Sequence, residues 1–148
     1  VHEQRLQLLR SALQKHQLSL LPHRAILAGA EVLEAGERGV QELAREPGSD
    51  WPTAIICSSD AVALGVLRGV AYRGLRVPEH LSITGFDDLA LARLSTPPLT
   101  SVRQPLVAMI GEALRLVERA GALTPPFPPH RPELVVRDST GLAGSRNP

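Results

Sequence analysis

The chain has 148 residues and a formal net charge of +1, so it is about one domain long and lacks the positive charge that a nucleic-acid-binding surface requires. Its hydrophobic content of 43% supports a folded core, which must be aliphatic because aromatic residues contribute only 3%. A single cysteine, Cys57, excludes an internal disulfide and a metal site with several cysteines, and its apolar surroundings favour a buried strand residue.

No apolar run approaches the length of a membrane span, and the polar N-terminus does not resemble a signal peptide. These features predict a cytoplasmic protein without a membrane partner. The five histidines are scattered without the paired spacing of metal ligands, so we predict neither a metal site nor a cofactor.

Helical spacing of leucines predicts a first helix over residues 3–18, which ends before Pro22. A short strand is predicted over 24–27, and a second helix over roughly 33–45. Gly36 and Gly39 each lower the stability of that helix by about 1 kcal/mol relative to alanine, which indicates close packing against a neighbour.

The run from Thr53 to Cys57 has no polar alternation, which is typical of a parallel strand buried on both faces. Asp60 then suits the N-cap of a third helix over 61–73. This helix is apolar nearly all round. One apolar stripe would cover a sheet, so the second predicts contact with another helix or another subunit.

Gly74 ends the third helix, and a strand over 81–86 follows. Asp87 and Asp88 come directly after this strand, at the carboxyl edge of the sheet, where open α/β sheets bind ligands. Adjacent strand residues point to opposite faces, so the two aspartates do not suggest a general acid–base pair.

A loop over 89–98 leads to a short extended piece over 99–102 and to a helix over 105–120. Five prolines make 124–132 a semi-rigid connector before a last strand over 133–137. The alternation predicts an α/β fold with a parallel sheet flanked by helices. A crossover helix normally joins two strands, so the opening on a helix predicts a fragment of a longer protein.

Residues 52–105 resemble the C-terminal half of the lactose-repressor (LacI/GalR) family of bacterial transcriptional regulators. The resemblance rests on PTAIICSSDAVALGVLRGVAYRGLRVPEHLSITGFDD and on LSTPPLTSVRQP after it, with ELVVRDST resembling the family's closing strand. It implies a type I periplasmic-binding-protein-like fold over 1–140, truncated and consisting mainly of the C-terminal lobe. Residues 1–103 and 133–138 would form this second lobe, helix 105–120 would belong to the first, and 141–148 would be a flexible tail.

The resemblance also implies a function. The chain would be the effector-binding and dimerisation part of a regulator that controls operator binding in response to a small molecule such as a sugar. Operator DNA would be bound by a domain absent from this chain. The family's dimers favour an interface on the third helix, through Val62, Val66 and Val70, although a wholly internal role for these residues is the alternative.

Through the same resemblance, Asp87 falls where family members hydrogen-bond ligand hydroxyls, and a carboxylate suits this role because it accepts two hydroxyls at once. Arg5, Ser59 and Gln104 match positions that line the effector cleft in family members. Glu31 departs from the pattern, because this position is often aromatic, and it indicates a polar or cationic effector or a degenerate site. Structural interpretations stay open: a solvated turn residue for Asp87, and surface residues for Arg5 and Glu31.

The sequence pattern also has two alternative functional interpretations. A periplasmic-type solute-binding protein of a sugar transporter would have the same fold, but the LSTPPLTSVRQP hinge segment and the lack of a signal favour the regulator. An enzyme of flavodoxin-like fold would need a phosphate loop or an activated nucleophile. The sequence contains no GxGxxG, GK[ST] or GxSxG motif, so we predict that the chain is not an enzyme.

Overall fold

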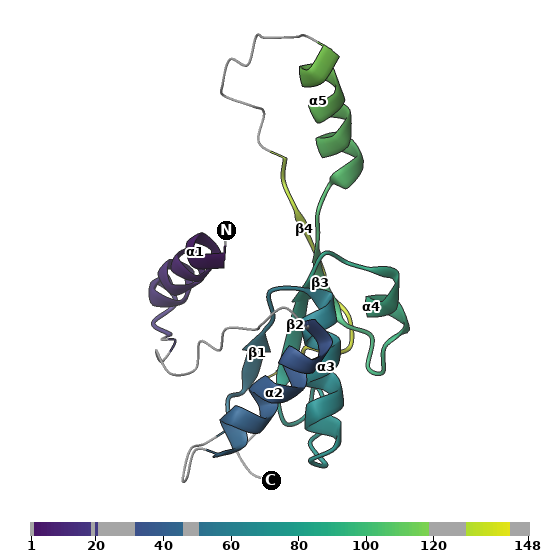
Figure 1. The fold of residues 1–148 in the computed structure, drawn as a ribbon. Helices are drawn as coiled ribbons and strands as arrows, with labels where there is room; N and C mark the ends of the chain where they lie inside the picture. The colour runs from purple at the N-terminus through teal and green to yellow at the C-terminus, as the bar shows by residue number, and fades with distance from the viewer. Residues whose placement is uncertain (1, 19, 21–31, 46–50, 119–129, 143–148) are drawn as a thin grey trace.

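The computed structural model describes residues 2–18, 20, 32–45, 51–118 and 130–142. Its elements in chain order are α1 (His2–Lys15), α2 (Val32–Arg45), β1 (Ala54–Ile56), α3 (Asp60–Ala71), β2 (Ser82–Phe86), α4 (Ala90–Leu94), β3 (Thr100–Arg103), α5 (Leu106–Glu118) and β4 (Glu133–Val135) (Figure 1).

The predicted helices and strands within these ranges are confirmed to within a few residues. The short helix α4 lies in the segment predicted as a loop, and five residues are too few for helical periodicity to reveal it. The predicted strand over 24–27, most of the connector over 124–132 and most of the tail over 141–148 lie outside the described residues.

The described strands form one sheet in the order β1-β2-β3-β4. The first three are parallel, as predicted, with Ile55 opposite Ile83 and Gly85 opposite Ser101. β4 pairs antiparallel with β3, so the sheet is mixed and not wholly parallel. The prediction that β1 is buried on both faces is wrong, because Ala54 and Ile56 are exposed and Ile55 is only partly buried.

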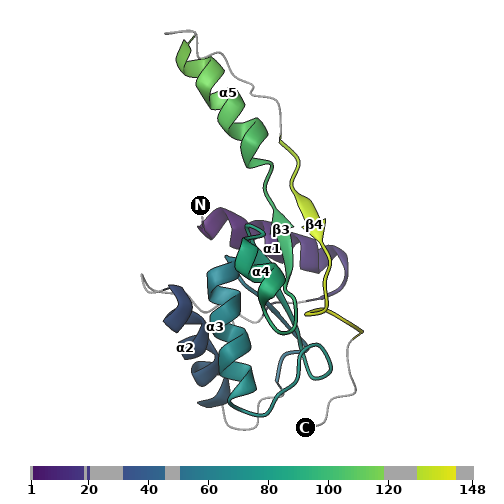
Figure 2. The same cartoon turned by 90° about the vertical axis from the view of Figure 1, so that its right-hand side faces the viewer.

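Helix α3 packs on strand β2, and helix α2 packs on α3 (Figure 2). Two glycines allow the helices to approach closely. A Cβ on Gly36 would lie 2.2 Å from the carbonyl oxygen of Val62, and a Cβ on Gly65 would lie 2.0 Å from that of Leu33. The prediction of close packing at Gly36 is therefore confirmed.

This packing corrects the predicted dimer interface. Val66 and Val70 are buried inside the chain, and Val62 is partly buried beside the same core. Because α2 and the sheet cover the two apolar stripes of α3, Val66 and Val70 do not offer a surface to a second subunit.

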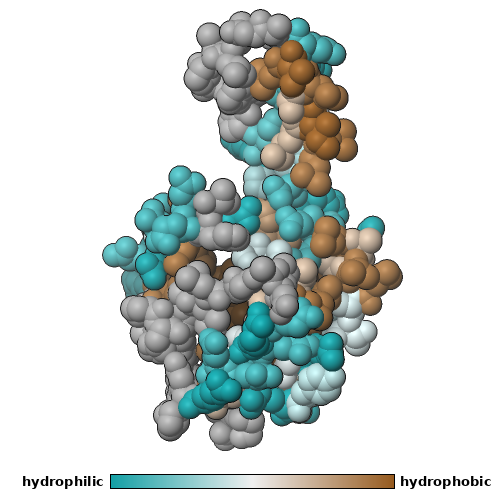
Figure 3. All heavy atoms as spheres, viewed as in Figure 1, coloured by the Kyte–Doolittle hydropathy of each residue, from teal (hydrophilic) through white to brown (hydrophobic). Residues whose placement is uncertain are grey.

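α5 stands away from the rest of the described structure, joined to it by the ends of β3 and β4 (Figures 1 and 2). None of its residues is buried. Its apolar side chains therefore form an uncovered surface, which runs along the upper part of the molecule in Figure 3. The largest exposed members are Leu106, Val107, Ile110, Leu114 and Val117.

Candidate functional site

The carboxyl end of β2 carries two aspartates in an unusual backbone conformation. The φ angles of Asp87 and Asp88 are 107° and 53°, in the left-handed region that residues other than glycine seldom occupy. Such conformations persist where surrounding contacts fix them, and they are common at functional sites. Both side chains leave the sheet at the edge where the sequence predicts the ligand site.

Asp87 and Gln104, two predicted effector contacts, lie together. The Gln104 Nε2 amide donates to Asp87 Oδ1 at 2.7 Å, and the backbone N–H of Asp87 donates to the carbonyl of Val102 at 2.9 Å. The end of β2 is thus tied to the end of β3, just before α5. Among the described residues, Gln104 is the only side-chain hydrogen-bond partner of this carboxylate, which leaves acceptor capacity for a ligand hydroxyl.

Arg5 reaches the same edge from α1. Its guanidinium carbon lies 4.2 Å from the centre of the Phe86 ring, and Nη1 donates to the carbonyl of Ser58 at 3.4 Å. Phe86 and Ser58 immediately precede Asp87 and Ser59 in the chain, so the arginine lies beside both predicted contacts. Glu31, the fifth predicted residue, lies outside the described residues.

Ser59 and not Asp60 caps α3, which corrects the sequence prediction by one residue. Ser59 has extended backbone angles, and its Oγ accepts from the backbone N–H of Val62 at 3.3 Å. Ser59 therefore has a structural role here, and its contact with an effector stays a prediction.

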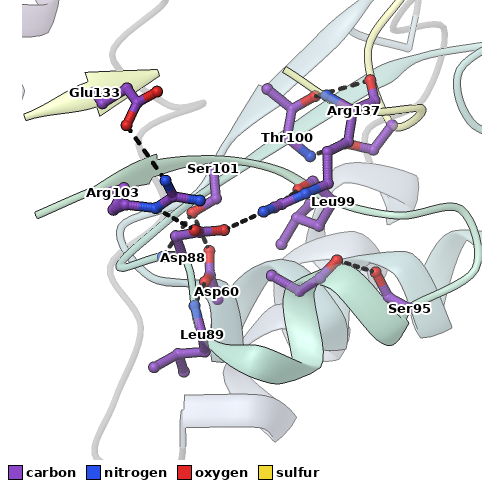
Figure 4. A network of polar contacts seen from close by, with 12 residues as sticks. Asp60, Asp88, Leu89, Ser95, Leu99, Thr100, Ser101, Arg103, Glu133 and Arg137 are labelled. Atoms are coloured by element: carbon purple, nitrogen blue, oxygen red, sulfur yellow. Dashed lines mark hydrogen bonds and ion pairs between the residues drawn. The ribbon is translucent and has the colours of Figure 1, made fainter. Parts of the chain in front are cut away.

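Asp60 instead joins three elements beneath the site (Figure 4). Its side chain is fully buried at 0% exposure; Oδ2 accepts from the Leu89 backbone N–H at 2.7 Å, and Oδ1 accepts from Ser101 Oγ at 2.5 Å. Gly85 makes room for it, because a Cβ there would lie 2.2 Å from Asp60 Oδ1. This role was not predicted from the sequence. The glycine inside the short strand β2 was its one local signal.

Asp88 has arginine partners from β3 and from the segment after β4. Arg103 Nε donates to Oδ2 at 2.7 Å and Arg137 Nη2 donates to Oδ1 at 2.5 Å (Figure 4). The Asp88 side chain is only 5% exposed. Burial alone would raise its pKa, but the hydrogen bonds and charges of Arg137 and Arg103 hold the pKa of Asp88 below its ordinary value. This carboxylate is therefore a structural anion.

Neither a metal site nor a reactive thiol is present in the described part of the chain. No group of three or more His, Cys, Asp or Glu side chains there is arranged to hold a metal ion. Cys57 is buried, as predicted. Its burial, and to a smaller extent the nearby charge of Asp60, raises the pKa of its thiol to about 12, so the thiol stays protonated. No helix among the described residues is both long and apolar enough to cross a membrane.

Comparison with known proteins places this architecture in a family. Residues 1–140 match the model of the periplasmic binding protein-like domain. The chain therefore belongs to the periplasmic binding protein-like domain family, and the predicted α/β fold of that type is confirmed.

Its relatives are transcriptional regulators of the lactose-repressor type, which confirms the resemblance found in residues 52–105. The chain is 39% identical over 105 residues to the ribose operon repressor of Haemophilus influenzae, covering 71% of this chain and 31% of the repressor. It is 43% identical over 114 residues to the regulator MalR of Streptomyces coelicolor, covering 75% of this chain and 32% of MalR. It thus spans about a third of the length of these curated relatives.

Solved structures of transcriptional regulators have the same fold as this chain. A complex of the transcriptional regulator CelR with cellobiose superposes with a TM-score of 0.76 at 34% identity, covering 91% of this chain and 41% of the other. The structure of the Escherichia coli transcriptional repressor ascG superposes with a TM-score of 0.71 at 33% identity, covering 88% of this chain and 47% of the repressor. The relatives are regulators and not enzymes or transporters.

Proposed function

We propose that this chain is the effector-binding part of a sugar-responsive transcriptional regulator of the lactose-repressor type. The observation that carries the proposal is the bond between Asp87 and Gln104 at the carboxyl edge of the sheet, with Arg5 beside them. A carboxylate, an amide and a guanidinium in one place match a ligand that carries several hydroxyl groups. The complex of the similar CelR with cellobiose supports a sugar as that ligand.

The uncovered surface of α5 supports the division into two lobes. We assign residues 1–103 and 133–138 to the second lobe and α5 to the first lobe, whose other parts would cover its apolar side chains. β3 and β4 would then be hinge strands. A sugar bound between the lobes would favour one angle between them, and this is the two-state behaviour that a ligand-controlled regulator needs.

Operator DNA would be bound by a domain outside these 148 residues, in the cytoplasm, and this chain would have no catalytic role. The test uses the full-length natural protein and the DNA upstream of its own gene, with binding followed by fluorescence anisotropy. D-ribose, maltose and cellobiose are added in turn. We expect specific DNA binding that one of these or a related sugar shifts at least tenfold. Sugar binding without any DNA binding would favour the solute-binding alternative.

We further propose a homodimer whose interface includes the α4 surface, defined as Leu89, Leu91 and Leu94. These three leucines are exposed, Leu94 at 77%. Figure 3 shows apolar atoms gathered at the right of the molecule, where Figure 1 places α4. Leucines exposed together favour burial against a partner, at about 25 cal/mol per Å² of apolar surface. The surface replaces Val66 and Val70, which the chain buries internally.

Replacing Leu91 and Leu94 by aspartate in the full-length protein should convert a dimer into a monomer, measured by multi-angle light scattering. Charges at a buried apolar contact are costly to desolvate, which is the reason for the expected dissociation. The control is Leu142→Asp, because Leu142 is exposed but belongs to the segment after β4 and not to α4. A wild-type monomer, or a double variant that remains dimeric, would contradict the proposed interface.

A further inference from the structure

We propose that Arg137 is a positioning residue for Asp87, acting through Asp88 to hold the left-handed turn that aims Asp87 at the effector. This inference rests on the proposed function, since it explains how the effector-binding carboxylate is placed. The Arg137 guanidinium itself donates to Asp88 and to the Leu99 carbonyl, and among the described residues it makes no hydrogen bond to Asp87, Gln104 or Arg5.

The turn is held through three successive backbone N–H groups. Those of Asp87, Asp88 and Leu89 donate to the Val102 carbonyl at 2.9 Å, Ser101 Oγ at 3.1 Å and Asp60 Oδ2 at 2.7 Å. These bonds fix the backbone on the side of β3 and α3. The side chain of Asp88 supplies the remaining restraint, and its two carboxylate oxygens each accept from one arginine.

Of the two arginines, Arg137 is the better anchor. Its side chain is 12% exposed, and its guanidinium fork joins Asp88 to the Leu99 carbonyl, to which Nη1 donates at 2.6 Å. The Arg103 side chain is 48% exposed and shares its guanidinium with Glu133 on the surface. A rigid fork with two short bonds restrains a carboxylate more than a solvated arginine does.

The backbone around Arg137 is itself fixed. Its N–H donates to Thr100 Oγ1 at 2.9 Å, and the same hydroxyl donates to the Arg137 carbonyl at 3.1 Å. Two residues later, Ser139 is fully buried, and its Oγ donates to the Ile83 carbonyl at 2.6 Å. Arg137 thus reaches Asp88 from a segment anchored to both β2 and β3, which is what a positioning residue requires.

The test measures hydrogen exchange of individual amides by NMR in the full-length protein, for wild type, Arg137→Met, Arg137→Lys and the control Arg93→Met. Arg93 is an exposed arginine on the neighbouring helix α4. We expect Arg137→Met to speed exchange of the amides of residues 87–89 about tenfold or more, while Val66, which is buried in the middle of α3, changes much less. Arg137→Lys keeps the charge without the fork and should give a smaller acceleration at the same amides.

The outcomes separate the possible roles. Equal acceleration at residues 87–89 and at Val66 would mean that Arg137 serves only global stability, and this would overturn the inference. Unchanged exchange at 87–89 in Arg137→Met would overturn it as well. If Arg137→Met does not fold, the Arg137→Lys comparison decides in the same way. Exchange needs no effector, so failure of the proposed function would appear separately, as a wild-type protein that no added sugar releases from DNA.

Discussion

The Asp87→Ala variant of the full-length protein should bind operator DNA like the wild type but lose its release by sugar. The methyl group of alanine cannot accept a hydroxyl, and it also leaves the Gln104 amide without its partner at 2.7 Å. Charge-assisted hydrogen bonds contribute roughly 1.5–3 kcal/mol, so the sugar concentration for half-release should rise about 10- to 100-fold. The measurement is operator anisotropy titrated with the sugar that releases the wild-type protein.

Two further variants make this result specific. Asp87→Asn keeps one acceptor oxygen and should fall between wild type and Asp87→Ala. Asp138→Ala removes an exposed aspartate on another segment and should leave release unchanged. An Asp87→Ala protein that responds to sugar at the wild-type concentration would exclude Asp87 as the ligand-facing carboxylate.

The Asp60→Ala variant should show the largest loss of stability. It deprives the Leu89 N–H and the Ser101 hydroxyl of a buried acceptor. Each unsatisfied buried group costs about 1–3 kcal/mol, so we expect the free energy of unfolding to fall by roughly 3 kcal/mol. Urea denaturation of the full-length protein, followed by circular dichroism, measures this change.

Asp60→Asn is the matched comparison, because its amide oxygen can still accept from one of the two donors. We expect it to lose about half as much free energy as Asp60→Ala. A loss below about 1 kcal/mol for Asp60→Ala would contradict the bridging role of this carboxylate.

The elements of this fold are readable from the sequence because their signals are local. Helical spacing gives α1, α2, α3 and α5, and β-branched or apolar runs give β1 and β2. The aspartates after β2 mark the site because they directly follow a strand. Their place at the sheet edge follows from the parallel pairing of β2 with β1 and β3.

The errors concern features that depend on tertiary contacts. An apolar stripe has the same pattern whether a helix of the same chain or another subunit covers it, so Val66 and Val70 were assigned to the wrong partner. Ser59 and Asp60 are both good caps, and the choice between them depended on Leu89 and Ser101, which lie far along the chain. Arg137 pairs with a residue 49 positions earlier, and no local pattern encodes that pairing.

The segment after β4 has a consequence for synthesis of the protein on the ribosome. Ser139 accepts from the Thr100 N–H and donates to the Ile83 carbonyl, and Arg137 completes the partners of Asp88. Ile83, Asp88 and Thr100 are translated well before Arg137 and Ser139. A chain released before residue 137 would leave the nearly buried Asp88 carboxylate with Arg103 as its one arginine partner among the described residues. We therefore expect the turn at residues 87–89 to take its final form only after residues 137–139 have been added, so that a prematurely released chain would lack a fully restrained candidate site.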